Sequence, residues 1–385
     1  MTKTIALLGA SGSVGRQAQE VARARGYKID ALSVGTNIVE AERAAREFHP
    51  RTVAVADESA AADLRLRLAD TDIKVVAGKH GICDMIADSS AETVVNAILG
   101  EAGLAPTLAT IDSGKRLALS NKESLVIAGE IVMNRARERG VEIIPVDSEH
   151  SAIFQSLKSG KNEEIRRMIL TASGGPFFGR SAKDLKEVTL DETLAHPTWK
   201  MGKKITVDSA TLMNKGFEVI EAAHLFSVNA DQIEVVIHRE SILHSAVEYI
   251  DNAIVGELSL PDMRSCVQYA VDYPHRIAGV GEPLDLFKLG KMTFARPDFV
   301  AFPLLDLAKR ALSDGGAMGA VLNAADEVAV AAFLDGKIGF ADIAMTVIAV
   351  YEKMADYKSH ITLDALYAAD REARLIANEL IKQEK

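Results

Sequence analysis

A glycine-rich turn near the beginning of the chain limits what this sequence can fold into. Residues 5–8 form an apolar run typical of a strand, and a helical pattern leads on to Arg25. Between them, Gly9, Gly12 and Gly15 are spaced as G-x-x-G-x-x-G. Glycines let the backbone approach a pyrophosphate closely, and the N–H groups at a helix start can bind its charge. A purely structural turn could have this spacing, but its place directly after the first strand favours a bound dinucleotide.

Patterns of strand and helix alternate over the first part of the chain. The further expected strands cover residues 29–34, 52–56, 73–77, 93–99, 117–120 and 141–146, and one expected helix covers residues 60–69. This alternation predicts the α/β class, with an N-terminal Rossmann-like, doubly wound domain whose ligands lie beyond the carboxyl ends of the strands. Residues 121–123 and 147–149 each follow such a strand end, so we expect both to face the crevice of the glycine turn.

The end of the second expected strand bears on the choice of dinucleotide. It reads Gly35-Thr36-Asn37, without the acidic residue that usually binds the ribose hydroxyls of NAD. Position 36 is not basic either, so the contact for a 2′-phosphate stays open, with Arg43 as a candidate.

Two acidic stretches predict a metal site. Asp147 and Glu149 follow a buried strand, and alternate side chains of an extended backbone point the same way. Neighbouring carboxylates repel each other, so we expect a hard divalent cation between them. Glu218, in the downstream stretch 208–218, could complete a cage of three carboxylates. The other interpretation is a solvated strand end with two surface acids.

Donors suited to a phosphate gather in two stretches. Ser173 is followed by two glycines, so its hydroxyl and the N–H groups of the turn could form an anion nest, or only a tight turn. Further on, an expected short strand at 205–207 leads into a helix that begins at Ser209. Ser209, Asn214 and Lys215 make a compact set of donors, which favours a phosphate site over a solvated lysine.

The segment from His196 to Lys203 is an expected loop, because Pro197 and Gly202 bracket it. It contains Trp199, the only tryptophan of the chain. A loop of this kind could close over a bound ligand, or its tryptophan could pack against the body of the protein.

The remaining patterns are those of a mixed sheet and a helical bundle. Strands are expected at 233–238 and 244–249, a loop that enters a helix at 256–264, an ordered connector at 274–302, and helices at 304–312, 321–334, 340–354 and 362–381. The helices are alanine-rich and carry charged residues on one side, which is typical of a structural bundle.

Composition excludes several classes of protein. The net charge of −10 argues against a general nucleic-acid binder. The chain has two cysteines, Cys83 and Cys266, too few for a disulfide framework, which fits a reducing cytoplasm. We expect no leader peptide, because a strand begins almost at once, and no apolar run is long enough to span a bilayer.

Several specific motifs follow one another along nearly the whole chain. They are the glycine turn at 9–15, Asn121-Lys122-Glu123-Ser124, Val146-Asp147-Ser148-Glu149-His150, residues 172–177, His196-Pro197 with Trp199 and Met201-Gly202, residues 208–218, residues 241–244, residues 261–264 and residues 322–325. In these motifs and their order, the sequence resembles the bacterial 1-deoxy-D-xylulose 5-phosphate reductoisomerases of the non-mevalonate isoprenoid pathway.

The resemblance implies a role for each matched residue. Asp147, Glu149 and Glu218 would hold Mg²⁺ or Mn²⁺, with Co²⁺ as a further option. The implied substrate-binding residues are Lys122, Ser148, Glu149, Ser173, His196, Trp199, Ser209, Asn214, Lys215 and Glu218, and the implied catalytic residues are Lys122, Glu149, His196 and His244. NADPH is the implied reductant, a sugar phosphate the implied substrate, and a homodimer the implied assembly. The implied cofactor-binding residues are Ser11, Gly12, Ser13, Val14, Gly35, Asn37, Ala97, Asn121, Glu123, Gly202 and Met263.

The implied reaction is metal-dependent isomerisation of 1-deoxy-D-xylulose 5-phosphate and NADPH-dependent reduction to 2-C-methyl-D-erythritol 4-phosphate. The expected domains are an NADPH-binding Rossmann-like domain at 1–147, a central α/β catalytic and dimerisation domain at 148–273, a linker at 274–302 and a C-terminal α-helical bundle at 303–385. By the same resemblance, hydroxamates of the fosmidomycin type are expected inhibitors.

The sequence departs from the family pattern at a few positions. Arg239-Glu240 stands where the family usually has Pro-Gln, Ser265-Cys266 replaces Thr-Pro, Ser259-Leu260 lacks a usual glycine, and Thr36 occupies a place where some members carry lysine. We expect these departures to lie partly near the nicotinamide and to affect cofactor preference and turnover. The alternatives are another metal-assisted oxidoreductase of a hydroxy acid or sugar phosphate, and a nucleotide-binding regulator without catalysis.

Overall fold

The computed structural model describes residues 3–359 and 361–383 of the chain. The chain forms two compact units, each built from segments that are separate in sequence. Unit 1 contains Met1–Ser124, Val132–Ser151 and Asp262–Pro283, and unit 2 contains Leu125–Ile131, Ala152–Pro261 and Leu284–Lys385. The four predicted domain boundaries stay predictions, and residues 1–2, 360 and 384–385 of those domains lie outside the described residues.

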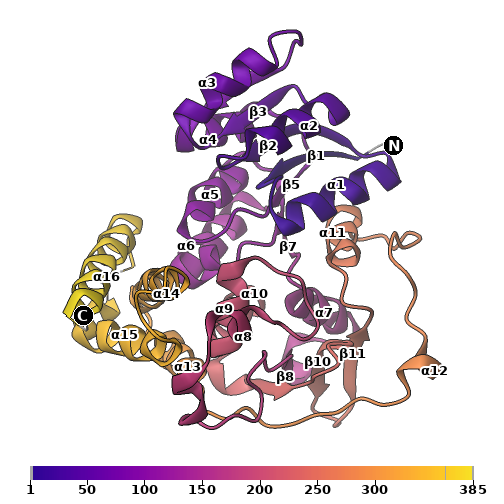
Figure 1. Ribbon diagram of the computed structural model, residues 1–385. Coiled ribbons are helices and arrows are strands. Elements are labelled where there is room, and N and C mark those ends of the chain that lie inside the picture. The colour runs from indigo at the N-terminus through magenta and orange to yellow at the C-terminus, as the bar shows by residue number, and fades with distance from the viewer. Residues whose placement is uncertain (1–2, 360, 384–385) are drawn as a thin grey trace. The chain divides into compact units, whose positions relative to one another are not determined.

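Unit 1 is built on a parallel sheet of seven strands (Figure 1). Their order is β4 (Lys74–Ala77), β3 (Thr52–Val55), β2 (Lys28–Val34), β1 (Thr4–Leu8), β5 (Thr93–Asn96), β6 (Arg116–Leu119) and β7 (Ile143–Pro145). The order reverses between β1 and β5, and open sheets of this kind bind ligands at such a point. The central strand β1 is almost fully buried, as expected for parallel strands covered on both faces. The predicted doubly wound fold is confirmed.

Helices connect the parallel strands of unit 1. They are α1 (Ser13–Arg25), α2 (Ile38–Phe48), α3 (Glu58–Arg67), α4 (Gly78–Asp88), α5 (Leu104–Asp112) and α6 (Glu123–Arg139), of which residues 125–131 belong to unit 2. The beginning of α7 (Ser148–Ser156), which follows β7, and α11 (Met263–Asp272) also belong to unit 1. α1 buries its small residues Ala18, Val21 and Ala22 and packs against α11. The stretch that contains α11 therefore belongs to unit 1, although it follows the second sheet in sequence.

Unit 2 contains a mixed sheet of four strands. Their order is β11 (Ile254–Leu258), β10 (Leu243–Tyr249), β8 (Ile165–Ala172) and β9 (Ile233–Ile237). β10 runs antiparallel to β11 and β8, whereas β8 and β9 are parallel. The expected loop over 256–264 is wrong at its start, because residues 256–258 pair with β10. Gly256 hid this strand, since glycine is rare in strand interiors.

The helices of unit 2 include the bundle expected at the C-terminal end. They are α8 (Leu190–Leu194), α9 (Lys203–Thr211), α10 (Met213–Phe226), α12 (Leu286–Leu289), α13 (Leu304–Asp314), α14 (Met318–Leu334), α15 (Phe340–Lys353) and α16 (Leu363–Gln383). The nearly fully buried α14 packs against α13, α15, α16 and α9 (Figure 1). The four predicted helices are confirmed. In the described part of the chain, none of the helices has the length and apolar character needed to cross a membrane.

Two expected strands differ from the structure. Residues 205–207 were expected to form a strand because they are β-branched, but they lie inside α9. The helix is stabilised by the ion pair between Lys204 and Asp208 (2.6 Å), and it buries residues 206–211, so tertiary packing outweighs the local propensity. β5 ends at Asn96, before the expected Leu99, because the Asn96 side chain accepts a hydrogen bond from the N–H of Ile98 (3.2 Å) and turns the chain.

Replacing Gly15 by alanine is expected to destabilise unit 1, because the added Cβ would lie 2.2 Å from the carbonyl oxygen of Gly9. Overpacking of this kind costs about 1–3 kcal/mol, so the variant should begin to unfold at a lower temperature in circular dichroism. The matched control is Gly279→Ala in the same unit, where the added Cβ meets no atom within 4 Å. Melting curves of Gly15→Ala that match wild type would contradict this account.

Candidate active site

The glycine turn of unit 1 is shaped for close approach of a ligand to the backbone. Gly9 has a φ of +76°, and a Cβ there would lie 2.5 Å from the carbonyl oxygen of Ala97. The turn is closed by a hydrogen bond from the N–H of Gly12 to the oxygen of Gly9 (3.0 Å). Gly12 caps α1 without a side-chain hydrogen bond, so the positive end of the helix dipole faces residues 11–14. These features suit a pyrophosphate.

The other candidate cofactor residues of unit 1 follow the ends of neighbouring strands. Gly35 and Asn37 follow β2, and the Asn37 side chain accepts a hydrogen bond from the N–H of Glu40 (3.1 Å), which caps α2. Ala97 follows β5, and its N–H bonds the oxygen of Leu8 (3.0 Å). Met263 opens α11, after the cap Asp262. Arg43 binds Glu40 and Glu47, so its side chain is already engaged within unit 1.

Asn121 organises the backbone at the ends of β5 and β6. Its side chain is 1% exposed and donates to the carbonyl oxygens of Ile98 (2.8 Å) and Gly100 (3.0 Å). It also donates to the carboxylate of Glu123 (2.9 Å) and accepts from the N–H of Ser124 (3.0 Å). Both predicted cofactor residues, Asn121 and Glu123, therefore lie at the beginning of α6, where Asn121 holds the loop that follows β5.

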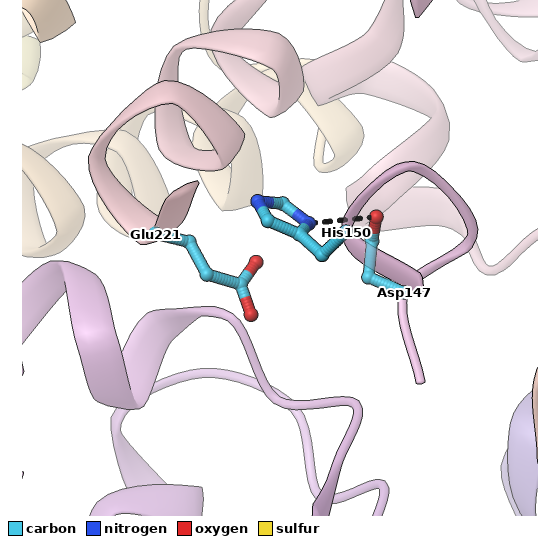
Figure 2. A group of neighbouring side chains, drawn as sticks. All are labelled: Asp147, His150 and Glu221. Carbon is cyan, nitrogen blue, oxygen red and sulfur yellow. Dashed lines mark hydrogen bonds and ion pairs between the residues drawn. The ribbon is translucent and has the colours of Figure 1, made fainter. Parts of the chain in front are cut away.

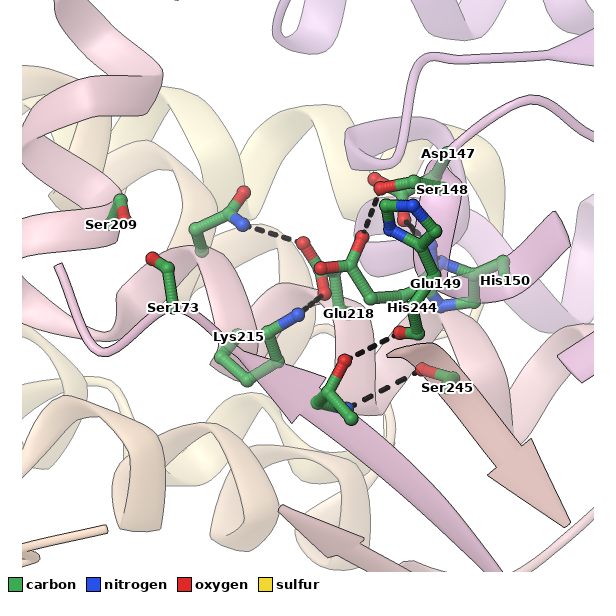
Figure 3. Close-up of polar contacts among 12 residues, drawn as sticks. Asp147, Ser148, Glu149, His150, Ser173, Ser209, Lys215, Glu218, His244 and Ser245 are labelled. Carbon is green, nitrogen blue, oxygen red and sulfur yellow. Dashed lines mark hydrogen bonds and ion pairs between the residues drawn. The ribbon is translucent and has the colours of Figure 1, made fainter. Parts of the chain in front are cut away.

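Asp147, a candidate metal residue of unit 1, has several polar neighbours, and Figure 2 shows its contact with His150. Its carboxylate lies 2.9 Å from the Lys122 ammonium and 3.0 Å from Nδ1 of the fully buried His150, and it accepts the N–H of Glu149 (3.2 Å). Ser148 donates its hydroxyl to the Glu149 carboxylate (2.5 Å). The predicted residue Lys122 is thus close to Asp147. Ser148 and Glu149 also lie beside Asp147 (Figure 3). His150 was not predicted as a site residue, and its spacing of three residues from Asp147 was the available signal.

The prediction of an extended backbone between Asp147 and Glu149 is wrong. α7 begins at Ser148, so Glu149 lies in the first turn of a helix and not on a strand. The two carboxylates are neighbours because Asp147 directly precedes the helix and accepts a bond from the N–H of Glu149. Acidic residues are favoured at this end of a helix, where the dipole is positive.

In unit 2, the turn after β8 carries Ser173. Gly174 and Gly175 have φ angles of +77° and +63°, and a Cβ on Gly175 would lie 2.7 Å from the carbonyl oxygen of Ser209. The turn therefore packs directly against α9, as only glycine allows. Ser173 Oγ accepts the N–H of Gly175 (3.2 Å) and lies 3.0 Å from Nε2 of His196.

The hydrogen bonds of His196 fix its tautomer. Nδ1 accepts the N–H groups of Thr198 (3.2 Å) and Trp199 (3.0 Å), so the proton of the neutral ring is on Nε2. That N–H faces the hydroxyls of Ser173 (3.0 Å) and Ser209 (3.2 Å). Because Ser173 Oγ already accepts an N–H group, its own O–H is directed to another acceptor. A phosphate oxygen would meet this requirement.

The beginning of α10 carries three more predicted residues. Leu212 takes a left-handed conformation (φ 60°) and separates α9 from α10. Asn214 and Lys215 lie in the first turn of α10, and both donate to the carboxylate of Glu218 (Figure 3). Lys215 is 4% exposed and Glu218 is 1% exposed, so the pair is buried. The interpretation of Lys215 as a solvated surface lysine is therefore wrong.

The loop with the tryptophan lies against the predicted histidines. The Trp199 ring is 6.2 Å from the ring of His244, which is 3% exposed on β10. Gly202 caps α9 and ends the loop. The loop is thus connected to the site residues through the rings of His196 and His244, and its role as a lid stays a prediction.

Comparison with known proteins gives a consistent result. Three family models match: 1-deoxy-D-xylulose 5-phosphate reductoisomerase over residues 5–129, the C-terminal domain of that enzyme over 143–226, and DXP reductoisomerase C-terminal domain over 258–376. The reductoisomerase of Caldanaerobacter subterraneus is 50% identical over 378 residues, which is 97% of each chain. That of Acetivibrio thermocellus is 50% identical over 99% of this chain and 100% of its own.

The chain belongs to the 1-deoxy-D-xylulose 5-phosphate reductoisomerase family.

Solved structures of the family have the same fold. A DOX-P reductoisomerase in complex with NADPH, fosmidomycin and magnesium superposes with a TM-score of 0.94 at 39% identity, covering 99% of this chain and 98% of that one. The Zymomonas mobilis enzyme in complex with NADPH gives 0.92 at 40% identity, with 99% of both chains covered. The expected family and the expected fold class are therefore confirmed.

The structure gives contacts for some of the departures from the family pattern, and their proximity to the nicotinamide stays a prediction. Arg239 contacts the Ser173–Gly175 turn, so it lies beside a residue of the predicted phosphate site. Cys266 lies in the first turn of α11 and is partly buried, whereas Glu240 accepts a hydrogen bond from the exposed Thr293. Sequence reasoning gave Arg239 no site role, because no spacing pattern marks a side chain that binds backbone carbonyl oxygens.

His196 is expected to titrate far below an ordinary histidine. Burial, with a smaller contribution from the charge of Arg239, lowers the pKa of His196 to about 4. The ring should therefore stay neutral in the folded protein through pH 5, where an unfolded histidine is protonated. NMR spectra recorded from pH 8 to pH 4 would measure this titration from the imidazole signals of His196, which are assigned by their absence in His196→Gln.

The expected effect on stability has a definite sign. Since the folded pKa of His196 is depressed, the unfolded state binds the proton first, and stability is lost as pH falls from about 6.5 toward 4. The melting temperature of His196→Gln should decline less than that of wild type over this window. An imidazole that titrates near pH 6.5 in the folded protein would contradict the assignment.

Proposed function

We propose that this chain converts 1-deoxy-D-xylulose 5-phosphate to 2-C-methyl-D-erythritol 4-phosphate, using NADPH and a divalent cation. The observation that carries the proposal is the intact donor set: three carboxylates and four phosphate donors, in a chain 50% identical to a named reductoisomerase. A regulator without catalysis has no use for the buried pair of Lys215 and Glu218, which is costly to maintain.

The proposed metal ligands are Asp147, Glu149 and Glu218. Each can offer one carboxylate oxygen to a metal ion, and a set made only of oxygen fits Mg²⁺ or Mn²⁺, with Co²⁺ also accepted. When bound, such a cation supplies Lewis acidity to the ketone and a neighbouring hydroxyl of the substrate. His150 would orient Asp147 through its 3.0 Å hydrogen bond.

The proposed phosphate site consists of Ser173, Ser209, Asn214 and Lys215. Its support is the position of Asn214 and Lys215 at the start of α10, where the helix dipole favours an anion. The outward O–H of Ser173, fixed by the bonds from Gly175 and His196, adds a donor. Binding of the phosphate would take Lys215 away from Glu218, which leaves that carboxylate available to the cation.

Lys122, Ser148 and Glu149 are the proposed contacts of the substrate hydroxyls. Rearrangement of the carbon skeleton requires a proton to leave the substrate hydroxyl that becomes the aldehyde, and a proton to reach the former ketone oxygen, which becomes a hydroxyl. Lys122 and Glu149 carry groups that can move protons, and their links to Asp147 keep both close to the chelated oxygens. His196 and His244, which both contact Trp199, would bind the substrate and shield it from water.

The proposed cofactor site lies along the ends of β1, β2, β5 and β6. NADPH supplies a hydride to the rearranged aldehyde. The bare helix start at residues 11–14 and the close approach of Gly9 to Ala97 support binding of its pyrophosphate. Arg43 is not a proposed contact of the 2′-phosphate, because its guanidinium already pairs with Glu40 and Glu47.

Removing one metal ligand in each unit tests the proposal. Asp147→Asn and Glu218→Gln should each lower metal-dependent NADPH oxidation with this substrate, followed at 340 nm, by at least about 10²-fold, because a chelating oxygen is lost. NADPH affinity, measured by its fluorescence, should stay within about twofold. The matched control is Glu163→Gln, an exposed acid of unit 2. Full activity without any divalent cation would refute the metal site, and a fosmidomycin-type hydroxamate without effect would refute the chelation.

We also propose a homodimer that pairs through the edge strand β11. β11 ends the sheet of unit 2, whereas the opposite strand β9 is covered at Ile237 by a bridge to Ala295. Ile250, Ile254 and Leu258 expose 65%, 58% and 38% of their surface along this edge. An open edge with apolar side chains is a template for another strand, and a second copy supplies the same one by twofold symmetry.

Charged residues on this edge should weaken the dimer. The double variant Ile254→Lys, Leu258→Lys is expected to shift the mass from light scattering toward that of one chain, because like charges would face each other across the twofold axis. Leu66→Lys is the control, since Leu66 is an exposed apolar residue (78%) on α3 of unit 1. A mass of two chains for the double variant at micromolar concentration would exclude this interface.

We also propose a cellular compartment and a class of partner for this protein. The low cysteine count, with neither Cys83 nor Cys266 in a disulfide, supports a reducing cytoplasm as the site of action. The net charge of −10 supports a small-molecule partner rather than a nucleic acid.

A further inference from the structure

Arg239 holds the backbone of the turn that follows β8. Its Nη1 donates to the carbonyl oxygens of Ser173 (2.8 Å) and Gly175 (2.6 Å). The guanidinium also lies 5.3 Å from the centre of the Phe178 ring, a cation–π distance. Three residues of one turn therefore contact a single side chain, which comes from the loop between β9 and β10.

Two of the three residues of the Ser173–Gly175 turn are glycines. Gly174 and Gly175 have positive φ angles, which glycine adopts without steric strain. Because glycine is equally free to adopt other backbone conformations, these residues do not by themselves hold the turn in one shape. The carbonyl oxygens of the turn carry negative partial charge and would repel a phosphate. A guanidinium bound to two of them fixes the turn and cancels that repulsion.

The loop that carries Arg239 is itself anchored. Glu240 accepts the hydroxyl (2.7 Å) and the N–H (3.2 Å) of Thr293. His238 Nδ1 donates to the oxygen of Thr293 (2.9 Å), because its Nε2 already accepts the N–H groups of Ile242 and Leu243. The stretch around Thr293 thus forms a strap across the base of the loop. Glu240 is directed to this strap, while Arg239 is directed to the turn.

The charge of Arg239 reaches the proposed phosphate donors. It contributes, after burial, to the lowered pKa of His196, whose Nε2 faces Ser173 and Ser209. Burial in turn lowers the pKa of Arg239 from its usual value, although a guanidinium remains charged at neutral pH. A positive charge beside two serine hydroxyls favours a dianion over a neutral ligand.

We propose that Arg239 is a positioning residue of the phosphate subsite, which clamps the Ser173–Gly175 turn through two carbonyl oxygens and adds one positive charge. This inference rests on the proposed function, because Ser173 must bind the substrate phosphate. Phosphate affinity would then depend on a side chain that touches the backbone of the turn and is not itself one of the four proposed phosphate donors.

The test separates the clamp from the charge by three substitutions. Arg239→Met removes both, Arg239→Gln keeps an N–H donor without the charge, and Arg239→Lys keeps the charge but not the planar fork. For Arg239→Met we expect the KM for 1-deoxy-D-xylulose 5-phosphate and the Ki of inorganic phosphate to rise about tenfold, as for a lost hydrogen bond to a charged group. kcat and NADPH affinity should change by less than about threefold, and Arg239→Lys should recover part of the loss.

A second measurement does not depend on turnover. The imidazole of His196 should titrate at higher pH in Arg239→Met and Arg239→Gln than in wild type, and Arg239→Lys should restore the wild-type value. The control is Arg180→Met, since Arg180 also stacks on a phenylalanine of this region, Phe177 (5.1 Å), but bonds Glu192 instead of the turn. Variants are compared only after their melting temperatures show that they fold. If Arg239→Met does not fold, Arg239→Lys is compared with wild type in its place.

The outcomes distinguish this inference from the proposed function. If wild type does not turn over the sugar phosphate, the proposed function fails, whereas the His196 titration and direct calorimetry with inorganic phosphate still test the clamp. If wild type is active and Arg239→Met binds phosphate and substrate as well as Arg180→Met does, the clamp is overturned. Equal losses in kcat and NADPH affinity would also overturn it, since they would indicate general damage.

Discussion

Two carboxylates of the proposed metal site pair with lysines of their own unit. Asp147 pairs with Lys122 at 2.9 Å in unit 1, and Glu218 pairs with Lys215 in unit 2. Removing one partner of a buried pair costs about 3–5 kcal/mol, because the remaining charge has lost its solvation. Each unit can therefore fold before any ligand binds, with the charges that the ligands require already in place. The same two lysines are the proposed contacts of the substrate.

This arrangement makes ligand binding an exchange of partners. A lysine that turns to the substrate leaves a carboxylate, and the carboxylate then needs another positive charge, which a divalent cation provides. Substrate and cation would consequently favour each other's binding, since neither exchange is complete alone. The helical bundle contributes indirectly: α14 packs against α9, and Lys204 of α9 binds Asp326 of α14 (2.8 Å), so the bundle fixes the helix that carries Ser209.

Much of this could be predicted from the sequence, for a physical reason. The glycine turn, the alternating strands and the bundle follow from periodicity and from conformations that only glycine adopts easily. Local geometry was less predictable: Glu149 was placed on a strand, but a helix begins at Ser148. The strand β11 was hidden by Gly256, and residues 205–207 became helical because packing outweighed their propensity. The role of Arg239 could not be predicted from the sequence, because its partners are backbone carbonyl oxygens, which every residue has.

His196 connects the loop to the phosphate donors through one ring. Its Nδ1 holds the N–H groups of Thr198 and Trp199, and its Nε2–H faces Ser173 and Ser209. Both sets of bonds require the neutral ring with the proton on Nε2, because a proton on Nδ1 would turn an acceptor into a donor against two N–H groups. Any shift of the serines on phosphate binding therefore acts on the segment that carries Trp199. The depressed pKa of this ring keeps that coupling independent of pH near neutrality.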